Sequence, residues 1–376
     1  METVEQRHTR EAAELQKRHS REIEDIQDRH RRERKELHER HARESECFAS
    51  ALGASVDGAA ASFEAKRRRR NVATPVAAAP LRNPHVYVLG GKAGTSVFSS
   101  VERFDPRSET WSDDIDSMSS KRGRHSVAVV DSRIYAMGGF DFRSSPSASV
   151  EVFDVRTSSW SNSAAMTTAR ADFAAAALGG AVYAIGGMDA ESEELASVER
   201  FDPREGKWAV VTPLRRPRCG HCAIACGDSI YALGGYDGTS IVASVERLDL
   251  RRGVWVEHSA MTTPRKDFAA VALGIELFAL GGHDDDACQL SSVERLDLTA
   301  AQPAWAWAPA MSTERSGLAA VELHGEIYAI GGVDGEYDKL ASVERFVPRA
   351  SVWVKAAQMG SKRSDHAAVV LGDAAL

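Results

Sequence analysis

GGMDAESEELASVERFDPREGKWAVVTPLRRPRCGHCAIACGDSIYALGG, residues 186–235, runs from one glycine pair to the next and holds one copy of a repeated unit. Six such pairs recur in the 376-residue chain at intervals of 48, 48, 48, 47 and 50 residues: Gly90-Gly91, Gly138-Gly139, Gly186-Gly187, Gly234-Gly235, Gly281-Gly282 and Gly331-Gly332. A fixed period of this length means that one supersecondary unit is copied six times. The repeat therefore sets the fold, and function is expected on the loops between its strands.

Each copy contains four short strand-like segments. An apolar segment such as 230–233 precedes the glycines, an alternating one such as 197–202 follows them, a third surrounds a tryptophan, and a fourth is rich in Ala and Val and follows an arginine. Four strands joined by Gly, Asp and Pro turns, with no helical pattern, are typical of a β-propeller blade. The sequence thus predicts an all-β, six-bladed propeller over 85–376. Its repeat tryptophans are Trp111, Trp160, Trp208, Trp255 and Trp353, and in the fifth copy either Trp305 or Trp307.

The ends of the repeat region predict how the ring closes. The chain enters just before a glycine pair and ends after the arginine segment 363–371. The C-terminal piece can therefore supply the strand that the first blade lacks, which protects sheet edges that an open array would expose. The alternative is a chain cut inside a seventh repeat.

Two further segments precede the propeller. Residues 1–48 contain no Gly or Pro, and Arg-His recurs there every 11 residues. Eleven residues make nearly three helical turns, so the pattern predicts a coiled-coil-like helix that would form a homo-oligomer, with a lone charged helix as the alternative. Residues 49–84 are expected to be a linker, whose basic run Lys66–Arg70 favours nuclear import or docking to an acidic surface.

Composition limits the class of protein. The net charge is −7, which argues against general affinity for nucleic acid. The five cysteines are scattered, the N-terminus is charged, and no apolar run reaches about 18 residues. We therefore expect a cytoplasmic protein with no membrane span.

The repeat resembles the kelch repeat in four marks. These are the double glycine, an aromatic or leucine seven residues before tryptophan, Met-x-x-x-Arg, and the tyrosine before the next pair. The Asp-Gly and Ser-Val-Glu-Arg details look most like the propellers of BTB-kelch substrate adaptors. The resemblance covers 85–371 and implies a six-bladed kelch propeller. Residues 49–84 leave no room for a BTB domain, which makes direct adaptor activity doubtful.

One arginine recurs at the same place in every repeat: Arg122, Arg170, Arg218, Arg265, Arg315 and Arg363. If the following strand lines the axis, the six would ring one mouth of the channel and favour carboxylate or phosphate ligands. The alternative is that each arginine braces its own blade.

In adaptor kelch domains, ligands are held just after the double glycine and at the arginine and the two residues following it. Carried over here, the resemblance implies Lys92, Phe140, Met188, Tyr236, His283 and Val333, with Arg122, Arg124, Arg218, Cys219, Lys266, Arg315, Ser316, Arg363 and Ser364. The expected partner is a protein or an acidic peptide segment.

No catalytic, metal or cofactor site is predicted. Cys219, Cys222 and Cys226 surround His221, but Cys222 and Cys226 align with Ala174 and Leu178 of the preceding repeat, and a zinc site would require a second pair. The rival functions are a kelch-fold enzyme resembling sugar mutarotases or oxidases, and a substrate-recognition subunit that reaches a ubiquitin ligase through a separate partner.

Overall fold

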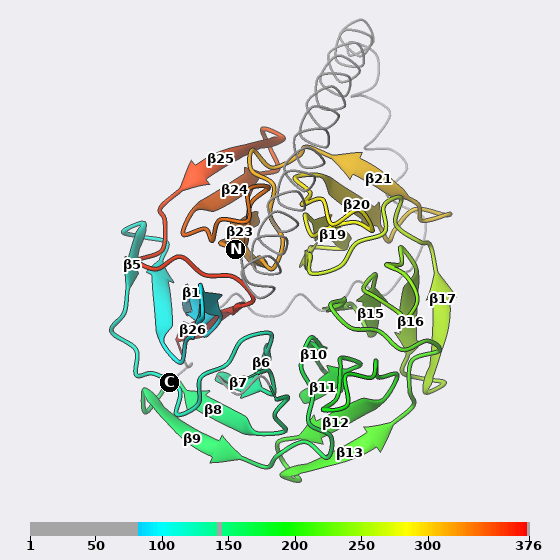
Figure 1. Ribbon diagram of the computed structural model, residues 1–376, viewed down its shortest axis with the longest axis horizontal. Coiled ribbons are helices and arrows are strands. Elements are labelled where there is room, and N and C mark those ends of the chain that lie inside the picture. The colour runs from blue at the N-terminus through cyan, green and yellow to red at the C-terminus, as the bar shows by residue number, and fades with distance from the viewer. Residues whose placement is uncertain (1–81, 141–144, 374–376) are drawn as a thin grey trace, which may run out of the picture. The chain divides into compact units, whose positions relative to one another are not determined.

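The computed structural model describes residues 82–140 and 145–373, which form a β-propeller (Figure 1). The predicted helix over 1–48, the basic run 66–70 and most of the predicted linker lie outside the described residues. Strand β1 begins at Arg82, three residues earlier than expected. Among the residues described, no helix has the length and apolarity needed to cross a membrane.

The described chain forms six four-stranded antiparallel sheets, the blades, as predicted. From the axis outward, blade 1 contains β26 (Ala367–Asp373), β1 (Arg82–Leu89), β4 (Val101–Asp105) and β5 (Thr110–Ser112). Blade 2 contains β6 (Ser126–Val130), β7 (Arg133–Met137), β8 (Val150–Asp154) and β9 (Ser159–Ser163). Blade 3 contains β10 (Ala174–Leu178), β11 (Ala181–Ile185), β12 (Val198–Asp202) and β13 (Lys207–Val211).

Blade 4 contains β14 (Cys222–Cys226), β15 (Ser229–Leu233), β16 (Val245–Asp249) and β17 (Val254–His258). Blade 5 contains β18 (Ala269–Leu273), β19 (Glu276–Leu280), β20 (Val293–Asp297) and β21 (Trp305–Ala308). Blade 6 contains β22 (Ala319–Leu323), β23 (Glu326–Ile330), β24 (Val343–Val347) and β25 (Val352–Ala356). A two-stranded hairpin, β2 (Lys92–Ala93) with β3 (Ser96–Val97), follows β1.

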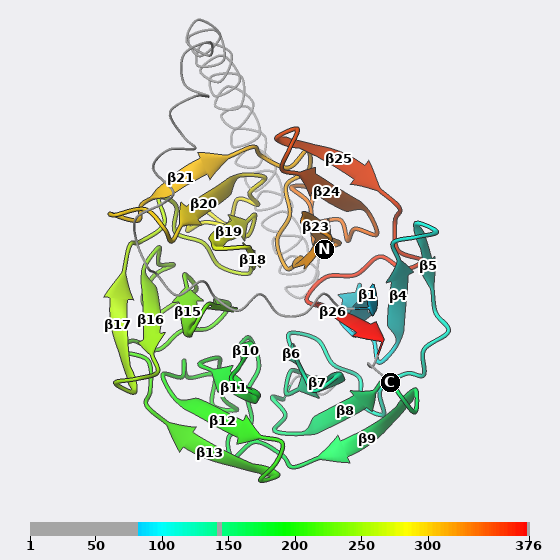
Figure 2. The ribbon, with the colours of Figure 1, turned by 180° about the vertical axis from the view of Figure 1, so that it is seen from behind.

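The C-terminal strand completes the first blade. β26 pairs antiparallel with β1, with Leu89 opposite Ala367 and His85 opposite Leu371. Both views of the ribbon show β26 beside β1 at the inner end of blade 1 (Figures 1 and 2). Strands from the two ends of the described chain therefore share one sheet.

The hydrophobic core lies between the blades. The tyrosine before a glycine pair packs on the aromatic residue in the third strand of the next blade, as Tyr135 does on Phe201, with ring centroids 5.7 Å apart. Tyr328 of blade 6 packs on Phe104 of blade 1 at 5.9 Å, which carries the same contact across the closure. The repeated residues thus hold neighbouring blades together.

The displaced tryptophan of blade 5 is Trp305. It lies opposite Leu296, as the other repeat tryptophans lie opposite an aromatic or leucine, and its indole N–H donates to Ser259 O at 2.9 Å. The same bond to the preceding blade is made by the other repeat tryptophans, for example from Trp111 to Ala357 O at 2.8 Å. Trp307 is therefore an additional residue, and it is 58% exposed.

Candidate protein-binding face

The six recurrent arginines lie inside the blades. Each is at most 1% exposed, and each donates to a glycine carbonyl, a serine and a glutamate of the same blade. Arg122 Nη1 donates to Gly138 O at 2.8 Å, and Nη2 donates to Ser149 Oγ at 2.8 Å and to Glu151 Oε1 at 2.9 Å. The alternative that each arginine braces its own blade is confirmed. The expectation that Arg122, Arg170, Arg218, Arg265, Arg315 and Arg363 ring the mouth of the channel is wrong, because these side chains are buried and their Nη donors are used within the blade.

Each brace also includes backbone N–H groups. Glu151 accepts hydrogen bonds from the N–H of Ser119 at 2.6 Å and of Ser120 at 3.1 Å. Burial acts to raise the pKa of Glu151, but the bonds from Ser119 and Arg122 outweigh it, and the pKa lies below its ordinary value. The carboxylate therefore stays charged opposite the guanidinium.

The axial mouth is built from the residues two positions after each arginine: Arg124, Asp172, Gly220, Asp267, Gly317 and Asp365. All six have φ between 51° and 59°, the left-handed region that Gly and Asp tolerate better than most residues. Each N–H donates to the carbonyl of the preceding member at 2.7–3.0 Å, so six hydrogen bonds close a ring around the axis. We call these residues the mouth ring.

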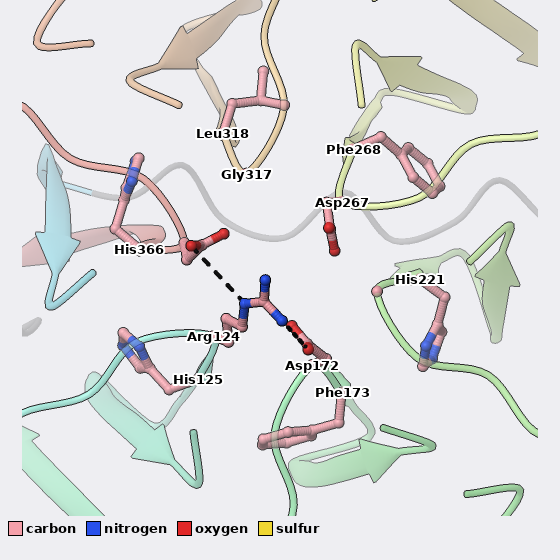
Figure 3. A pocket seen from close by; sticks show the side chains of 12 residues that line it. Arg124, His125, Asp172, Phe173, His221, Asp267, Phe268, Gly317, Leu318 and His366 are labelled. Carbon is pink, nitrogen blue, oxygen red and sulfur yellow. Dashed lines mark hydrogen bonds and ion pairs between the residues drawn. The ribbon is translucent and has the colours of Figure 1, made fainter. Parts of the chain in front are cut away.

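Arg124 crosses the mouth (Figure 3). Its Nη1 lies 2.7 Å from Asp172 Oδ2 and its Nε lies 3.9 Å from Asp365 Oδ2. A cavity of about 100 Å³ lies here, lined by the mouth ring and the residues that follow it. Burial raises the pKa of Asp172 to about 6 although Arg124 opposes this effect, and burial also raises the pKa of Asp267. The mouth ring therefore holds three carboxyl groups beside one guanidinium, and burial opposes the ionisation of two of them.

A second ring follows the first: His125, Phe173, His221, Phe268, Leu318 and His366. Their side chains turn away from the axis and pack between the blades (Figure 3). Burial lowers the pKa of each histidine to about 3, and no imidazole nitrogen of the three has a hydrogen-bond partner within the described ranges. These imidazoles are neutral packing groups.

Around the mouth, each blade carries a short three-residue bridge, which we call a face ladder. The central member of each ladder is the residue that follows the glycine pair. It forms antiparallel β-bridges with two residues: the one that follows an arginine, and the one that lies six or seven positions after the second glycine. The ladders are Ser364–Lys92–Val97, Gly123–Phe140–Pro146, Ala171–Met188–Glu194, Cys219–Tyr236–Ile241, Lys266–His283–Gln289 and Ser316–Val333–Lys339. We call the surface formed by the six ladders the loop face.

The structure thus places the other expected residues on one face. Lys92, Phe140, Tyr236 and His283 occupy the central position of their ladders and are half-buried, whereas Ser316 and Ser364 are buried beside them. The third ladder member, such as Lys339 or Glu194, was not predicted. Its distance from the glycine pair varies by one residue, so the repeat register does not mark it.

The loop face has an apolar half and a basic half. Blades 2 to 4 present mainly apolar central and third members, such as Phe140, Met188 and Ile241, while blades 5, 6 and 1 present bases. Lys92 Nζ lies 2.6 Å from Asp365 Oδ2. Burial lowers the pKa of Lys339. The charge of Asp365 acts to raise this pKa and the charge of Lys92 acts to lower it, so Lys339 lies near both residues.

Blades 4 and 5 meet at an aromatic and polar cluster. Lys266 Nζ lies 5.4 Å from the centre of the Tyr236 ring, a cation–π contact. His283 Nδ1 lies 3.8 Å from Asp267 Oδ2, and burial lowers the pKa of His283, as does Lys266. This side of the mouth can offer both an aromatic surface and hydrogen-bond donors.

Cys219 and Cys226 are buried thiols, and Cys222 is half-buried. Burial raises the pKa of Cys219 to about 12 and that of Cys222 further, and Cys222 Sγ contacts Phe268 O at 3.0 Å. Over 82–140 and 145–373, no three His, Cys, Asp or Glu side chains are grouped to hold a metal.

Comparison with known proteins agrees with this architecture. The KLHDC2/KLHL20/DRC7 Kelch-repeats domain matches residues 66–235, 124–299 and 173–376. Two F-box/kelch-repeat proteins of Arabidopsis thaliana are 39% and 35% identical over 75 and 89 residues, which is 20% and 23% of this chain and 18% of each relative. The chain thus covers about a fifth of the length of these relatives.

A solved structure shares the fold. The structure of YjhT superposes with a TM-score of 0.60 at 14% identity, over 67% of this chain and 88% of that one. Kelch propellers generally serve in protein interaction. Six repeats, six blades and a family match that spans the propeller show that the chain belongs to the kelch-repeat family.

Proposed function

We propose that the loop face binds a segment of a partner protein that carries an acidic group beside apolar side chains. The observation that carries this proposal is Lys339, a base that lies beside the paired charges of the mouth. Lys92 and Arg124 both approach Asp365, at 2.6 and 3.9 Å. Lys339 lies near them and makes no ion pair within the described part of the chain. Asp365 and Asp172 already pair with Lys92 and Arg124, so a partner's carboxylate would pair with Lys339.

The apolar half of the face supports the second part of the proposal. Tyr236, Met188 and Phe140 are half-buried and vary from blade to blade, although construction of the blade does not require this variation. Aromatic side chains of this kind commonly anchor interfaces. The acidic group would bind over blades 6 and 1, and the apolar groups over blades 2 to 4.

A charge-reversal experiment tests the proposal. The double variant Lys92→Glu/Lys339→Glu should fail to recover proteins that the wild-type chain recovers from cell extract, because the partner's carboxylate would meet like charge. The matched control is Lys207→Glu/Lys355→Glu, which makes the same charge change on the exposed outer strands β13 and β25. Retention of the same proteins by the loop-face variant would refute the proposal.

The relatives favour a second candidate function. Because they are named F-box/kelch-repeat proteins, we propose that this propeller could also serve as the substrate-recognition part of a ubiquitin ligase, acting through a separate partner. In that case, ligase subunits should be recovered with the wild-type chain, and the loop-face partner should accumulate when the protein is depleted from cells. An unchanged partner level would contradict this role.

An enzyme receives less support. The cavity at the mouth has a volume of about 100 Å³, below the roughly 300–1,000 Å³ typical of small-molecule sites. A second cavity of about 330 Å³, lined by His85, Asp105, Arg107 and His324 among others, reaches the lower end of that range. Oligomerisation through residues 1–48 and a cytoplasmic location, with nuclear import through 66–70, remain proposals from the sequence. Sizing with and without residues 1–48 tests the first, and imaging of a tagged chain tests the second.

A further inference from the structure

The second cavity owes its lining to the way in which blade 1 closes. In blades 2 to 6, a two-residue turn joins the first strand to the second, as residues 324–325 join β22 to β23. Blade 1 has no such turn, because β26 and β1 come from the two ends of the described chain. Asn83 and Pro84 lie there instead, and they border a cavity of about 330 Å³ together with the turn after β4 and the turn of blade 6. This lining is therefore specific to the junction of blades 6 and 1.

The cavity lies at the end of the propeller opposite the loop face. β1 ends at Leu89, directly before a glycine pair of the loop face, so His85 lies toward the far end of that strand. β22 begins just after Gly317 of the mouth ring and ends at Leu323, so His324 also lies at the far end. Blades 1 and 6 are neighbours in both views of the ribbon (Figures 1 and 2). A ligand in this cavity would leave the loop face free.

The backbone is irregular around this cavity. Between Arg82 and His85, β1 has one more residue than the opposite stretch of β26, and such a bulge redirects side chains and is frequent next to active sites. Asn83 and His324 have φ of 44° and 55°, a region that few residues other than glycine adopt. At the turn position of His324, blades 3, 4 and 5 have Gly179, Gly227 and Gly274. Building the turn therefore does not require a histidine.

Two imidazoles from neighbouring blades line the cavity. His85 is half-buried and His324 is exposed, and neither imidazole forms a hydrogen bond within the described ranges. At the strand position of His85, the other blades have Arg133, Ala181, Ser229, Glu276 and Glu326. The two histidines are thus a feature of one junction and not of the repeat.

A guanidinium is held beside them. Arg107 Nη2 donates to Asn83 Oδ1, whereas the side chain of Arg204, at the same turn position of blade 3, makes no hydrogen bond among the residues described. The one acid of the lining, Asp105, is already engaged, because its Oδ1 accepts the N–H of Arg107 at 2.8 Å. This bond lowers the pKa of Asp105, and the charge of His85 acts in the same direction. The remaining N–H donors of Arg107 are available to a ligand.

We propose that this cavity binds a small molecule through an oxyanion, a carboxylate or a phosphate group, which Arg107 holds with His85 and His324 as further donors. A guanidinium matches the oxygen atoms of either group with two parallel hydrogen bonds. The volume reaches only the lower end of the range of small-molecule sites, so the ligand is small. Pro84 and Pro106 give the cavity apolar walls beside these donors.

The test is a titration of the full chain with inorganic phosphate and, separately, with succinate, followed by NMR of the imidazole C2–H signals. The signals of His85 and His324, identified by their loss in His85→Gln and His324→Gly, should shift and saturate with at least one probe. The probe that binds more tightly identifies the preferred oxyanion. Arg107→Gln should weaken that binding about tenfold or more, because it removes a charged donor. The matched control is Arg204→Gln, in an identical Asp-Pro-Arg turn whose N–H bond to Asp202 is 3.0 Å, and it should bind as the wild type does.

Two further variants separate binding from folding and from the loop face. His324→Gly introduces the residue that blades 3 to 5 have at this turn position, so it should not lower the urea midpoint, yet it should weaken binding as judged from the His85 signal. Lys92→Glu/Lys339→Glu, on the loop face, should bind the probe like the wild type. The proposal is overturned if neither histidine signal responds to either probe, if Arg107→Gln binds as tightly as the wild type, or if Arg204→Gln weakens binding to the same extent.

Discussion

Replacing Arg265 by Met should destabilise the propeller strongly without involving any ligand. Arg265 and Glu294 are both fully buried and lie 3.1 Å apart. The substitution removes the donors to Gly281 O at 2.8 Å and Ser292 O at 3.0 Å, and it leaves Glu294 charged in the interior. Breaking a buried pair from one side costs about 3–5 kcal/mol.

The matched control is Arg295→Met, one residue along β20 from Glu294. Arg295 is half-exposed and pairs with Glu276 at 3.2 Å, so its loss should cost at most about 1 kcal/mol. Both variants are unfolded in urea and followed by circular dichroism, and their midpoints are compared at equal slope. If Arg265→Met unfolds within 1 kcal/mol of the control, the buried brace is not stabilising, and a ligand role for the six arginines would have to be reconsidered.

Three further results are expected. Gly91→Ala should cost several times more than Gly94→Ala, because Gly91 has φ 88° and an added Cβ would lie 2.6 Å from another side chain, whereas Gly94 has open space; equal urea midpoints would contradict this. Leu371→Ala, in the closing strand and 2% exposed, should cost about 2–5 kcal/mol, and a surface-like loss below 1 kcal/mol would show that β26 is not packed as described. Because the pKa of Asp172 is raised to about 6, its protonated form stabilises the fold at low pH, and that stability is lost as pH rises from about 4 to 6. Asp172→Asn should remove this decline. An unchanged pH profile of the urea midpoint in that variant would refute the prediction.

The six blades could be predicted from the sequence because the residues that build each blade recur with the same period as the blades themselves. The glycine pair is required where a Cβ at Gly90 would lie 2.4 Å from Arg122 O, and so it recurs in every copy. The fifth tryptophan could not be chosen between Trp305 and Trp307, because the preceding turn differs in length and only strand pairing fixes the register.

The arginines were misplaced for a physical reason that the sequence also contains. Five of the six arginines are followed 28 or 29 residues later by the glutamate of Ser-Val-Glu-Arg or its equivalent, as Arg122 is by Glu151, and Arg363 pairs with Glu102 of the first copy. Two opposite charges that recur together in every copy indicate mutual pairing. Lys339 could not be found this way, since its loop varies in length and its neighbour Lys92 belongs to the first copy of the repeat, at the other end of the sequence.

In the mouth ring, the backbone closes the ring and the side chains determine the charge. Its six N–H···O bonds run head to tail around the axis, so their peptide dipoles circulate and nearly cancel, and the backbone gives an approaching partner almost no field. The sign of the opening is then set by side chains alone, at six left-handed positions that accept Asp, Asn or Gly. Exchanging Asp172, Asp267 and Asp365 for Asn would shift the charge there by three while leaving the backbone ring in place. One propeller can therefore be retuned for partners of opposite charge without rebuilding any blade.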